Sequence, residues 1–190
     1  MYLEVSIQDY FWSSSDSEVE NLKVHNELDK ISPMSDEDWK TLFQKWLEIL
    51  QSDIPPAENY ELSLRLTGDR EIQTLNAQYR HQNQPTDVLA FAALEVNFPQ
   101  PEEVDSDLPL YLGDIVISVE TAFRQAKQQK HLLITELAWL AAHGFLHLLG
   151  WDHPDEKSLR QMLEQQLILL DSVGITIGEQ IIEKNILESE

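Results

Sequence analysis

The stretch HGFLHLLGWDH, residues 143–153, contains three of the six histidines of the chain. His143 and His147 are four residues apart in an apolar run, so both rings are expected on one face of a helix, one turn apart. Gly150 follows at a point where a helix can end in a left-handed residue, and such a turn brings His153 back towards the other two. The spacing therefore predicts a metal site with three imidazole ligands.

Three imidazoles suit zinc, and the chain has no cysteine to complete a closed structural site. A fourth position left to water makes the site catalytic, because zinc lowers the pKa of bound water towards about 7. We expect one ion per chain, although other divalent transition metals such as nickel, cobalt and copper also accept these ligands. Two alternatives remain open. Either some of the histidines are hydrogen-bonded core residues, or the zinc is structural and Asp152 is its fourth ligand.

The residue after the first histidine bears on the substrate. Metzincin proteases share this histidine spacing, but there the second position is a glutamate that acts as the general base. Gly144 occupies that position here and has no side chain to accept a proton. The pattern has the three metal ligands but lacks the general base, so it disfavours peptide hydrolysis by the metzincin mechanism.

The elements that must position the histidines alternate along the chain. Short apolar or alternating runs indicate strands near 1–10, 61–68, 85–94 and 112–120. Apolar residues at helical spacing indicate helices over 36–50, 69–80, 121–130, 135–149 and 155–172. This order predicts an α+β fold in which a small mixed β-sheet packs against several helices, with the zinc site on a helix–turn segment.

The length of 190 residues and a hydrophobic content of 42% suit a single domain that spans residues 1–190. Residues 13–35 are polar and acidic without clear periodicity, which is typical of a flexible insertion. Residues 173–190 form an acidic, partly helical C-terminal extension. The chain has no cysteine, no leader-like N-terminus and no long apolar run, so we expect a soluble, cytoplasmic protein.

The charge restricts the choice of partners. The chain has 34 acidic and 13 basic residues, and the net charge of −21 repels polyanions at long range. Binding to RNA would need a local basic groove. The basic residues in the middle of the chain are the candidates for it: Arg65, Arg70, Arg80, Arg124, Lys127 and Lys130.

Two further segments join the histidine motif in resembling one family. HGFLHLLGWDH matches every fixed position of the zinc motif of the YbeY endoribonucleases, H-G-x-L-H-L-x-G-[YW]-D-H. LNAQYRHQNQPTDVLAFA resembles that family's L-N-x-x-[YF]-R…P-T-D-V-L-S-F stretch, and LGDIVIS resembles its L-G-D-I-x-I-S strand. Ala90 and Ala92 depart from the usual Ser and Pro, but neither replaces a metal ligand.

The resemblance extends roughly over residues 60–172. It implies that His143, His147 and His153 bind zinc and that Arg80 is the functionally important arginine beside the metal cleft. It also implies zinc-dependent cleavage of single-stranded RNA, in maturation of the 3′ end of small-subunit (16S) ribosomal RNA and in ribosome quality control. The implied partners are precursor ribosomal RNA and ribosomal subunits or assembly proteins, and neither DNA nor a membrane is expected.

The chemistry of Arg80 agrees with that role, because a guanidinium can hold two phosphate oxygens at once and stabilise a charged transition state. The alternative is an arginine that caps a helix end or pairs with an acid. Asp87, Asp114 and Asp152 are candidates for orienting the ligands or for capping turns. For Asp87 and Asp114 the structural role is the simpler interpretation.

Two other functions remain as alternatives. One is a non-catalytic ribosome-assembly factor in which zinc only stabilises the fold. The other is a metallohydrolase that acts on a different substrate.

Overall fold

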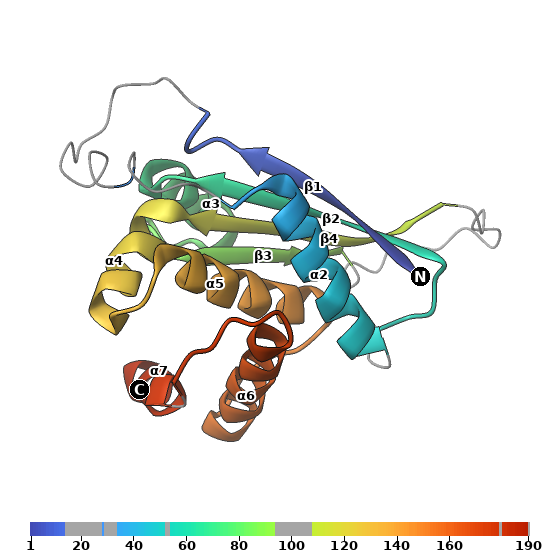
Figure 1. The fold of residues 1–190 in the computed structure, drawn as a ribbon. Helices are drawn as coiled ribbons and strands as arrows, with labels where there is room; N and C mark the ends of the chain where they lie inside the picture. The colour runs from blue at the N-terminus through green and yellow to red at the C-terminus, as the bar shows by residue number, and fades with distance from the viewer. Residues whose placement is uncertain (14–27, 29–33, 52–53, 94–107, 179, 190) are drawn as a thin grey trace.

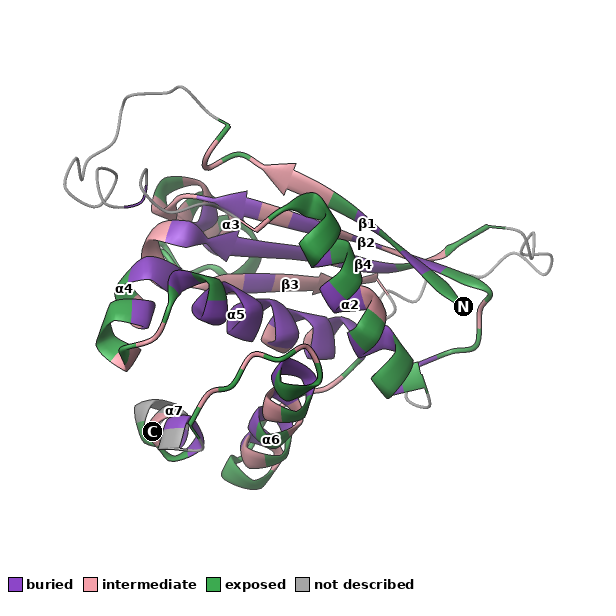
Figure 2. Ribbon diagram, in the orientation of Figure 1, coloured by how far each residue is buried: buried purple, intermediate pink, exposed green. Residues whose placement is uncertain are grey.

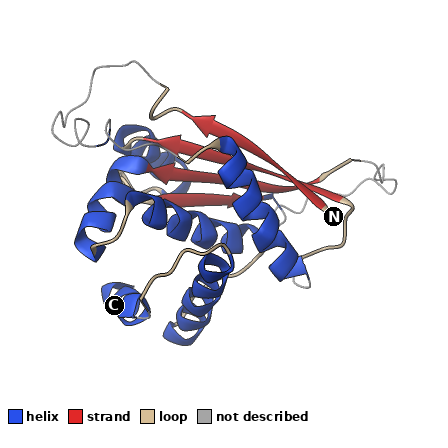
Figure 3. Cartoon of the chain, in the orientation of Figure 1, coloured by secondary structure: helices blue, strands red, loops and turns tan. Residues whose placement is uncertain are grey.

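A computed structural model describes the chain except residues 14–27, 29–33, 52–53, 94–107, 179 and 190. The strands are β1 (Tyr2–Asp9), β2 (Asn59–Thr67), β3 (Val88–Ala92) and β4 (Leu110–Ser118). The helices are α2 (Asp36–Leu50), α3 (Asp69–Arg80), α4 (Val119–Gln129), α5 (Leu133–Leu148), α6 (Glu156–Ser172) and α7 (Gln180–Ser189). Every strand and helix expected from the sequence is present (Figure 3). Most of the expected insertion at 13–35 lies outside the described residues.

The four strands form one sheet in the order β1-β2-β4-β3. β1 and β4 both pair with β2 in parallel, and β3 pairs with β4 antiparallel. The prediction of a small mixed sheet is confirmed. The register shifts between Glu61 and Leu62, which pair with Tyr111 and Gly113, and Gly113 has a φ of 135°. Only glycine fits there, because a Cβ would lie 2.1 Å from the carbonyl oxygen of Phe91.

Helices cover the two faces of the sheet unequally (Figure 1). The larger core lies on the face covered by α2 and α5, where Leu62, Leu64, Ile115 and Ile117 are all buried. The smaller cluster lies under α3 on the other face and joins Ile72 to Leu89 and Val116. Side chains of β4 therefore alternate between the two cores, as expected of a strand buried on both faces.

The helix α5 is buried along nearly its whole length, between the sheet and α6 (Figure 2). A helix that is apolar on all sides is typical of such an interior position. Gly144 allows its close approach to β4, because a Cβ at that position would lie 2.8 Å from Cγ2 of Ile115. The residue that excludes a metzincin-like glutamate therefore also lies at a close contact between helix and sheet.

The chain after α6 is not merely a solvated tail. Gly174 adopts a φ of 79°, and α7 then packs its buried residues Ile181, Ile182 and Ile186 against the core. Arg160 on α6 and Glu183 on α7 form an ion pair of 2.8 Å. The expected acidic extension thus contributes an apolar face to the fold. Among the described residues no helix is long and apolar enough to cross a membrane.

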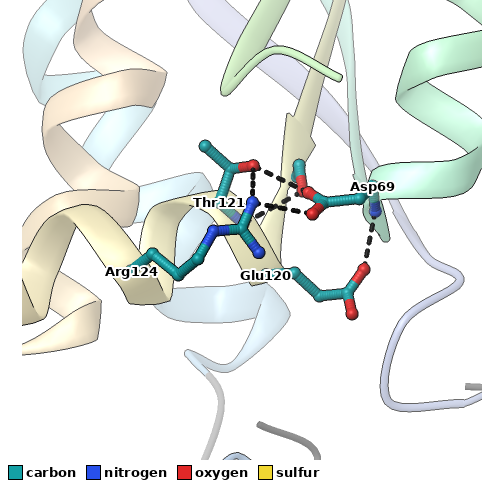
Figure 4. Close-up of polar contacts among 5 residues, drawn as sticks. Asp69, Glu120, Thr121 and Arg124 are labelled. Atoms are coloured by element: carbon teal, nitrogen blue, oxygen red, sulfur yellow. Dashed lines mark hydrogen bonds and ion pairs between the residues drawn. The ribbon is translucent and has the colours of Figure 1, made fainter. Parts of the chain in front are cut away.

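A polar cluster joins the beginnings of α3 and α4, which follow the adjacent strands β2 and β4 (Figure 4). Asp69 accepts hydrogen bonds from the hydroxyls of Ser118 and Thr121, at 2.5 and 2.7 Å, and from the guanidinium of Arg124 at 2.7 Å. Its backbone N–H donates to Glu120 at 2.7 Å. The cluster fixes the start of α3 and with it the direction in which the helix carries Arg80.

Burial alone would raise the pKa of Asp69, but the hydrogen bonds from Ser118, Thr121 and Arg124 outweigh it and keep the pKa below its usual value. A carboxylate with a lowered pKa stabilises the fold at pH values above the unfolded pKa of about 3.9. That contribution is lost as the pH falls through the folded pKa.

We expect Asp69→Asn to lower the free energy of unfolding at pH 7 by about 1–2 kcal/mol, a value that allows for the exposure of Arg124. The difference from wild type should shrink at about pH 3, below the unfolded pKa of about 3.9, because the carboxyl group of the unfolded wild-type chain then takes up a proton and part of the stabilisation is lost. Urea unfolding at both pH values measures this difference. Asp171→Asn on the exposed side of α6 is the matched control, and an equal loss in both variants would contradict a specific role for the cluster.

Candidate metal centre

The turn after α5 places the third histidine. Gly150 has a φ of 87°, which confirms the expected left-handed residue. Its N–H donates to the carbonyl of His147 and the N–H of Trp151 donates to that of Leu146, both at 3.0 Å. This pair of bonds is a Schellman motif, which ends the helix and reverses the chain. The reversed segment then carries His153 back towards the end of α5.

The imidazole rings of the three histidines lie close together. The Nε2 atoms of His143 and His147 are 3.1 Å apart, and one ligand atom from each of the three histidines lies within 4.8 Å of the others. The ring centroid of His153 is 5.4 Å from that of His143 and 5.2 Å from that of His147. The described residues therefore contain three histidines that can hold one metal ion.

Two oxygen acceptors orient these rings. Nδ1 of His143 lies 3.0 Å from Oε1 of Gln166, and Nδ1 of His147 lies 2.9 Å from the carbonyl oxygen of Trp151. Gln166 is fully buried, and its Nε2 donates to the carbonyl of Trp139, so its oxygen is the atom that faces His143. Both Nδ1 atoms must therefore carry the proton, since an oxygen without hydrogen can only accept.

The two Nε2 atoms are then unprotonated and present lone pairs to each other at 3.1 Å. No proton lies between them, so a cation is the natural partner of both. Two nitrogen ligands of a tetrahedral zinc, each at about 2.0–2.1 Å from it, lie roughly 3.3 Å apart. The observed separation fits a shared metal ion, and buried partners on the outer nitrogens are typical of histidine ligands.

Burial and neighbouring charges also favour the neutral form of His143 and His147. Burial lowers the pKa of His143 to about 4, and burial together with the neighbouring His153 lowers the pKa of His147. Both imidazoles are neutral at pH 7, which is the form that binds metal.

The histidines lie in a cleft of about 520 Å³ that Arg80 also lines. Arg80 is the last residue of α3, is exposed, and is close enough to His147 for its charge to lower the pKa of that ring. Its guanidinium makes no hydrogen bond or ion pair with any residue that the structure describes. The alternative of an arginine paired with an acid or capping carbonyls therefore has no support within the described chain.

The segment between α3 and β3 holds Arg80 in place. His81 ends α3 in the left-handed conformation, with a φ of 59°. Asn76 is buried on the helix, and its side-chain amide donates to the carbonyl of Gln84 at 2.8 Å. These contacts fold the loop back along the helix, so that both Arg80 and Asp87 face the cleft.

The three candidate aspartates occupy different environments. Asp87 lines the cleft and accepts hydrogen bonds from the N–H of Val88 and from Nε2 of Gln125, both at 2.8 Å. Asp152 also lines the cleft and accepts from the backbone N–H of His153 at 2.8 Å. None of these three hydrogen bonds reaches a ligand ring: two come from backbone N–H groups and the third comes from a side chain of α4.

Asp114 lies elsewhere. It shares a face of β4 with Val116, which packs under α3, whereas the histidines lie beyond the opposite face. Its carboxylate contacts Tyr111 and contributes to raising the pKa of that phenol, after the larger effect of burial. The structure does not bring Asp114 together with the histidines.

Gln166 is a functional candidate that the sequence reasoning missed. It lies on α6 among the apolar residues Met162, Leu163, Leu169 and Leu170, all of them buried. An uncharged polar residue in the middle of a buried stripe needs a hydrogen-bond partner, and this was the available signal. The pattern does not reveal that the partner is His143, which lies 23 residues earlier in the chain.

The fold and the site together define a class: an α+β protein with three histidines that can hold a metal ion in a cleft, beside an arginine that pairs with no described residue. Residues 23–174 match the family model described as Endoribonuclease YbeY. The protein of that name from Trichodesmium erythraeum is 71% identical over 174 residues, which cover 92% of this chain and 94% of that one. The chain belongs to the YbeY endoribonuclease family.

Other matches are more distant. The Endoribonuclease YbeY of Trichormus variabilis is 59% identical over 176 residues, which cover 93% of this chain and 97% of that one. The solution structure of TM1509 from Thermotoga maritima is 24% identical, with a TM-score of 0.47, and the match covers 90% of this chain and 88% of that one.

The turn at Gly150 can be tested against a matched position. Gly174 also follows a helix with a positive φ, and at both glycines a Cβ would meet nothing within 4 Å. We expect Gly150→Ala and Gly174→Ala each to lower the free energy of unfolding by about 1–2 kcal/mol, the cost of a left-handed alanine. Only Gly150→Ala should also weaken zinc binding, by about tenfold, because it displaces His153 and the Trp151 carbonyl.

Competition with a chromophoric chelator measures the zinc affinity, and urea unfolding measures the stability. Equal zinc affinities in the two variants would contradict the role assigned to the turn.

The hydrogen bond from His143 to Gln166 is a separate test. We expect Gln166→Leu to weaken zinc binding by about 10–100-fold, because the ring loses the acceptor that orients it. Gln166→Glu keeps an acceptor oxygen and should retain most of the affinity. Gln161→Leu, on the exposed side of α6, is the control for a glutamine replacement on this helix. If Gln166→Leu binds zinc as tightly as the control, the orienting role is wrong.

Proposed function

We propose that this protein is a zinc-dependent endoribonuclease that cleaves single-stranded RNA and takes part in 3′-end maturation of small-subunit ribosomal RNA and in ribosome quality control. The observation that carries the proposal is the placement in one cleft of three converging imidazoles and an exposed arginine that pairs with no described residue. Family membership supports the same activity, since the relatives are named endoribonucleases. Precursor ribosomal RNA in the cytoplasm is the proposed substrate, with ribosomal subunits or assembly proteins as partners.

Zinc is the proposed metal, with one ion per chain. Three imidazole nitrogens match its preferences, two of them on rings whose Nδ1 protons point away from the site, and the chain has no cysteine to close the site. When bound, the ion supplies a Lewis acid beside the phosphate, where negative charge develops during cleavage. Gln166 and the Trp151 carbonyl hold His143 and His147 so that their lone pairs face it.

Arg80 is the proposed phosphate ligand. Its guanidinium can donate two parallel hydrogen bonds to two phosphate oxygens, and no described acid competes for them. Its charge acts locally, which matters because the net charge of −21 opposes approach of RNA at long range. A substrate is thus held by a few short contacts in the cleft and not by a broad basic surface.

We infer that residues 1–190 act as one domain. The support for this is the core itself, since one cluster includes buried residues from β1 near the N-terminus to α7 near the C-terminus. The cleft, like the core, is formed by elements from much of the chain, since its walls come from α3, β3, α4, α5, α6 and α7.

The cleavage test uses a labelled single-stranded RNA that carries the 3′ end of the small-subunit ribosomal RNA precursor. We expect zinc-loaded wild type to cut it, His147→Ala to lose at least about 100-fold in rate with its metal ligand, and Arg80→Ala to lose about 10²–10³-fold. Arg80→Lys keeps the charge but not the paired geometry and should stay well below wild type.

The control is His81→Asn, which removes an exposed histidine and keeps a residue type that tolerates the left-handed conformation. Circular dichroism checks that all variants are folded. Full activity in His147→Ala would show that the cleavage comes from a contaminant. A folded, zinc-loaded wild type that never cuts would instead favour a non-catalytic assembly factor.

A further inference from the structure

The cleft does not end at the metal centre. It continues along α5 towards the beginning of that helix, where Glu136 lies seven residues, or about 10.5 Å along the axis, from His143. We call this part of the cleft the α4–α5 arm. Its walls are formed by Gln125, Gln128 and Gln129 of α4, Glu136 and Trp139 of α5, and Ile181 of α7.

Charge is unevenly distributed in the cleft. Of the described residues that line it, Arg80 is the single lysine or arginine, and it lies at the metal end beside His147. The arm has amide side chains, apolar side chains and the acid Glu136 instead. The metal end therefore suits a phosphate, whereas the arm suits a neutral group with hydrogen-bond donors and acceptors.

Glu136, the one acid among the described residues of the arm, is kept in its neutral form by its surroundings. Burial raises the pKa of Glu136 to about 8, with a further contribution from Asp87 and an opposing one from Lys184, and burial also lowers the pKa of its hydrogen-bond partner His131. A protonated carboxyl group beside a neutral imidazole is the favoured state at pH 7. The arm therefore does not repel an incoming nucleotide as a carboxylate would.

Gln125 is held in place at one wall of the arm. Its Nε2 donates to the carboxylate of Asp87 at 2.8 Å, and a carboxylate cannot donate in return, so the amide orientation is determined. Its Oε1 is buried and has no hydrogen-bond partner among the described residues. An oxygen with almost no accessible surface is out of reach of a ligand in the cleft, so Gln125 contributes a fixed wall of the arm and not a ligand contact through this atom.

We propose that the α4–α5 arm is a nucleobase subsite, which binds the base of a nucleotide next to the phosphate held by the metal centre and Arg80. The proposal rests on the proposed function, because it takes that phosphate to belong to RNA. Glutamine side chains pair with base edges through one donor and one acceptor. Trp139 and Ile181 supply apolar surface for the face of the base.

The chemistry distinguishes a base from other occupants of the arm. A second phosphate would need a cation there, and the arm has none among its described lining residues. A purely apolar group would leave the amides of Gln128 and Gln129 without partners. A planar, neutral ring with polar edges satisfies both kinds of wall at once.

The first test is equilibrium binding to the zinc-loaded protein of the four nucleoside 5′-monophosphates, compared with ribose 5-phosphate, which has the same phosphate and sugar but no base. We expect at least one nucleotide to bind about tenfold or more tightly than ribose 5-phosphate. That advantage should fall to near unity in the double variant Gln128→Ala/Gln129→Ala and stay unchanged in Gln161→Ala. Arg80→Ala should weaken all five ligands by a similar factor.

The subsite is overturned if no nucleotide binds better than ribose 5-phosphate, or if the advantage of the base survives in the double variant. Thermal unfolding of the double variant, whose substitutions lie in the last turn of α4, checks that the fold is intact.

A second measurement separates this inference from the proposed function. A pool of random single-stranded RNA is incubated with wild type and with the double variant, and the cut ends are sequenced. A base preference next to the cut that disappears in the double variant supports both. Base-dependent binding without any cleavage leaves the subsite in place and overturns the nuclease, whereas cleavage with no base preference in wild type overturns the subsite alone.

Discussion

The burial of α5 between the sheet and α6 is the constraint on which the rest of the structure depends. The helix can lie this close to β4 because Gly144 has no side chain at the point where Ile115 contacts it. Burial removes water from His143 and His147, which keeps both rings neutral, and it also creates a need for hydrogen-bond partners at their outer nitrogens. Gln166 on α6 and the Trp151 carbonyl in the turn meet that need. The packing that forms the core thus also keeps His143 and His147 neutral and orients their rings.

The second functional group is positioned by different means. Arg80 is exposed and lies at the end of a helix whose beginning is fixed to α4 through Asp69. The loop after it is fixed by Asn76 and by the contacts of Asp87. The exposed guanidinium has room to adjust to a phosphate, whereas the imidazoles cannot move without disturbing the core. The distribution of burial between these groups therefore matches the chemistry proposed for each.

Much of this was accessible from the sequence because it is local. The spacing of His143 and His147, the left-handed Gly150 and the apolar stripe of α2 are each fixed by residues within a few positions of one another. The capping box that begins α2, between Ser35 and Asp38, is equally local. The α+β fold and the family were correctly predicted for the same reason, since motif and element order lie in the chain itself.

The remainder depends on contacts between distant parts of the chain. Periodicity does not specify the strand order, in which β4 lies between β2 and β3, or the face on which Asp114 lies. Gln166 contacts a histidine 23 residues away, and α7 reaches the cleft through Ile181 although its sequence reads as a charged tail. Such positions carry a polar or apolar residue whose partner is set only by the packing.

The central claim is that a metal ion held by His143, His147 and His153 is required for cleavage of RNA in this cleft. The most direct measurement is a titration of zinc into chelator-treated protein, with zinc content by mass spectrometry and the initial rate of single-stranded RNA cleavage measured on the same samples. The account predicts a rate that is negligible without metal and rises in proportion to occupancy until one ion is bound per chain. Cleavage at full rate by the metal-free protein, or a rate independent of occupancy, would contradict it.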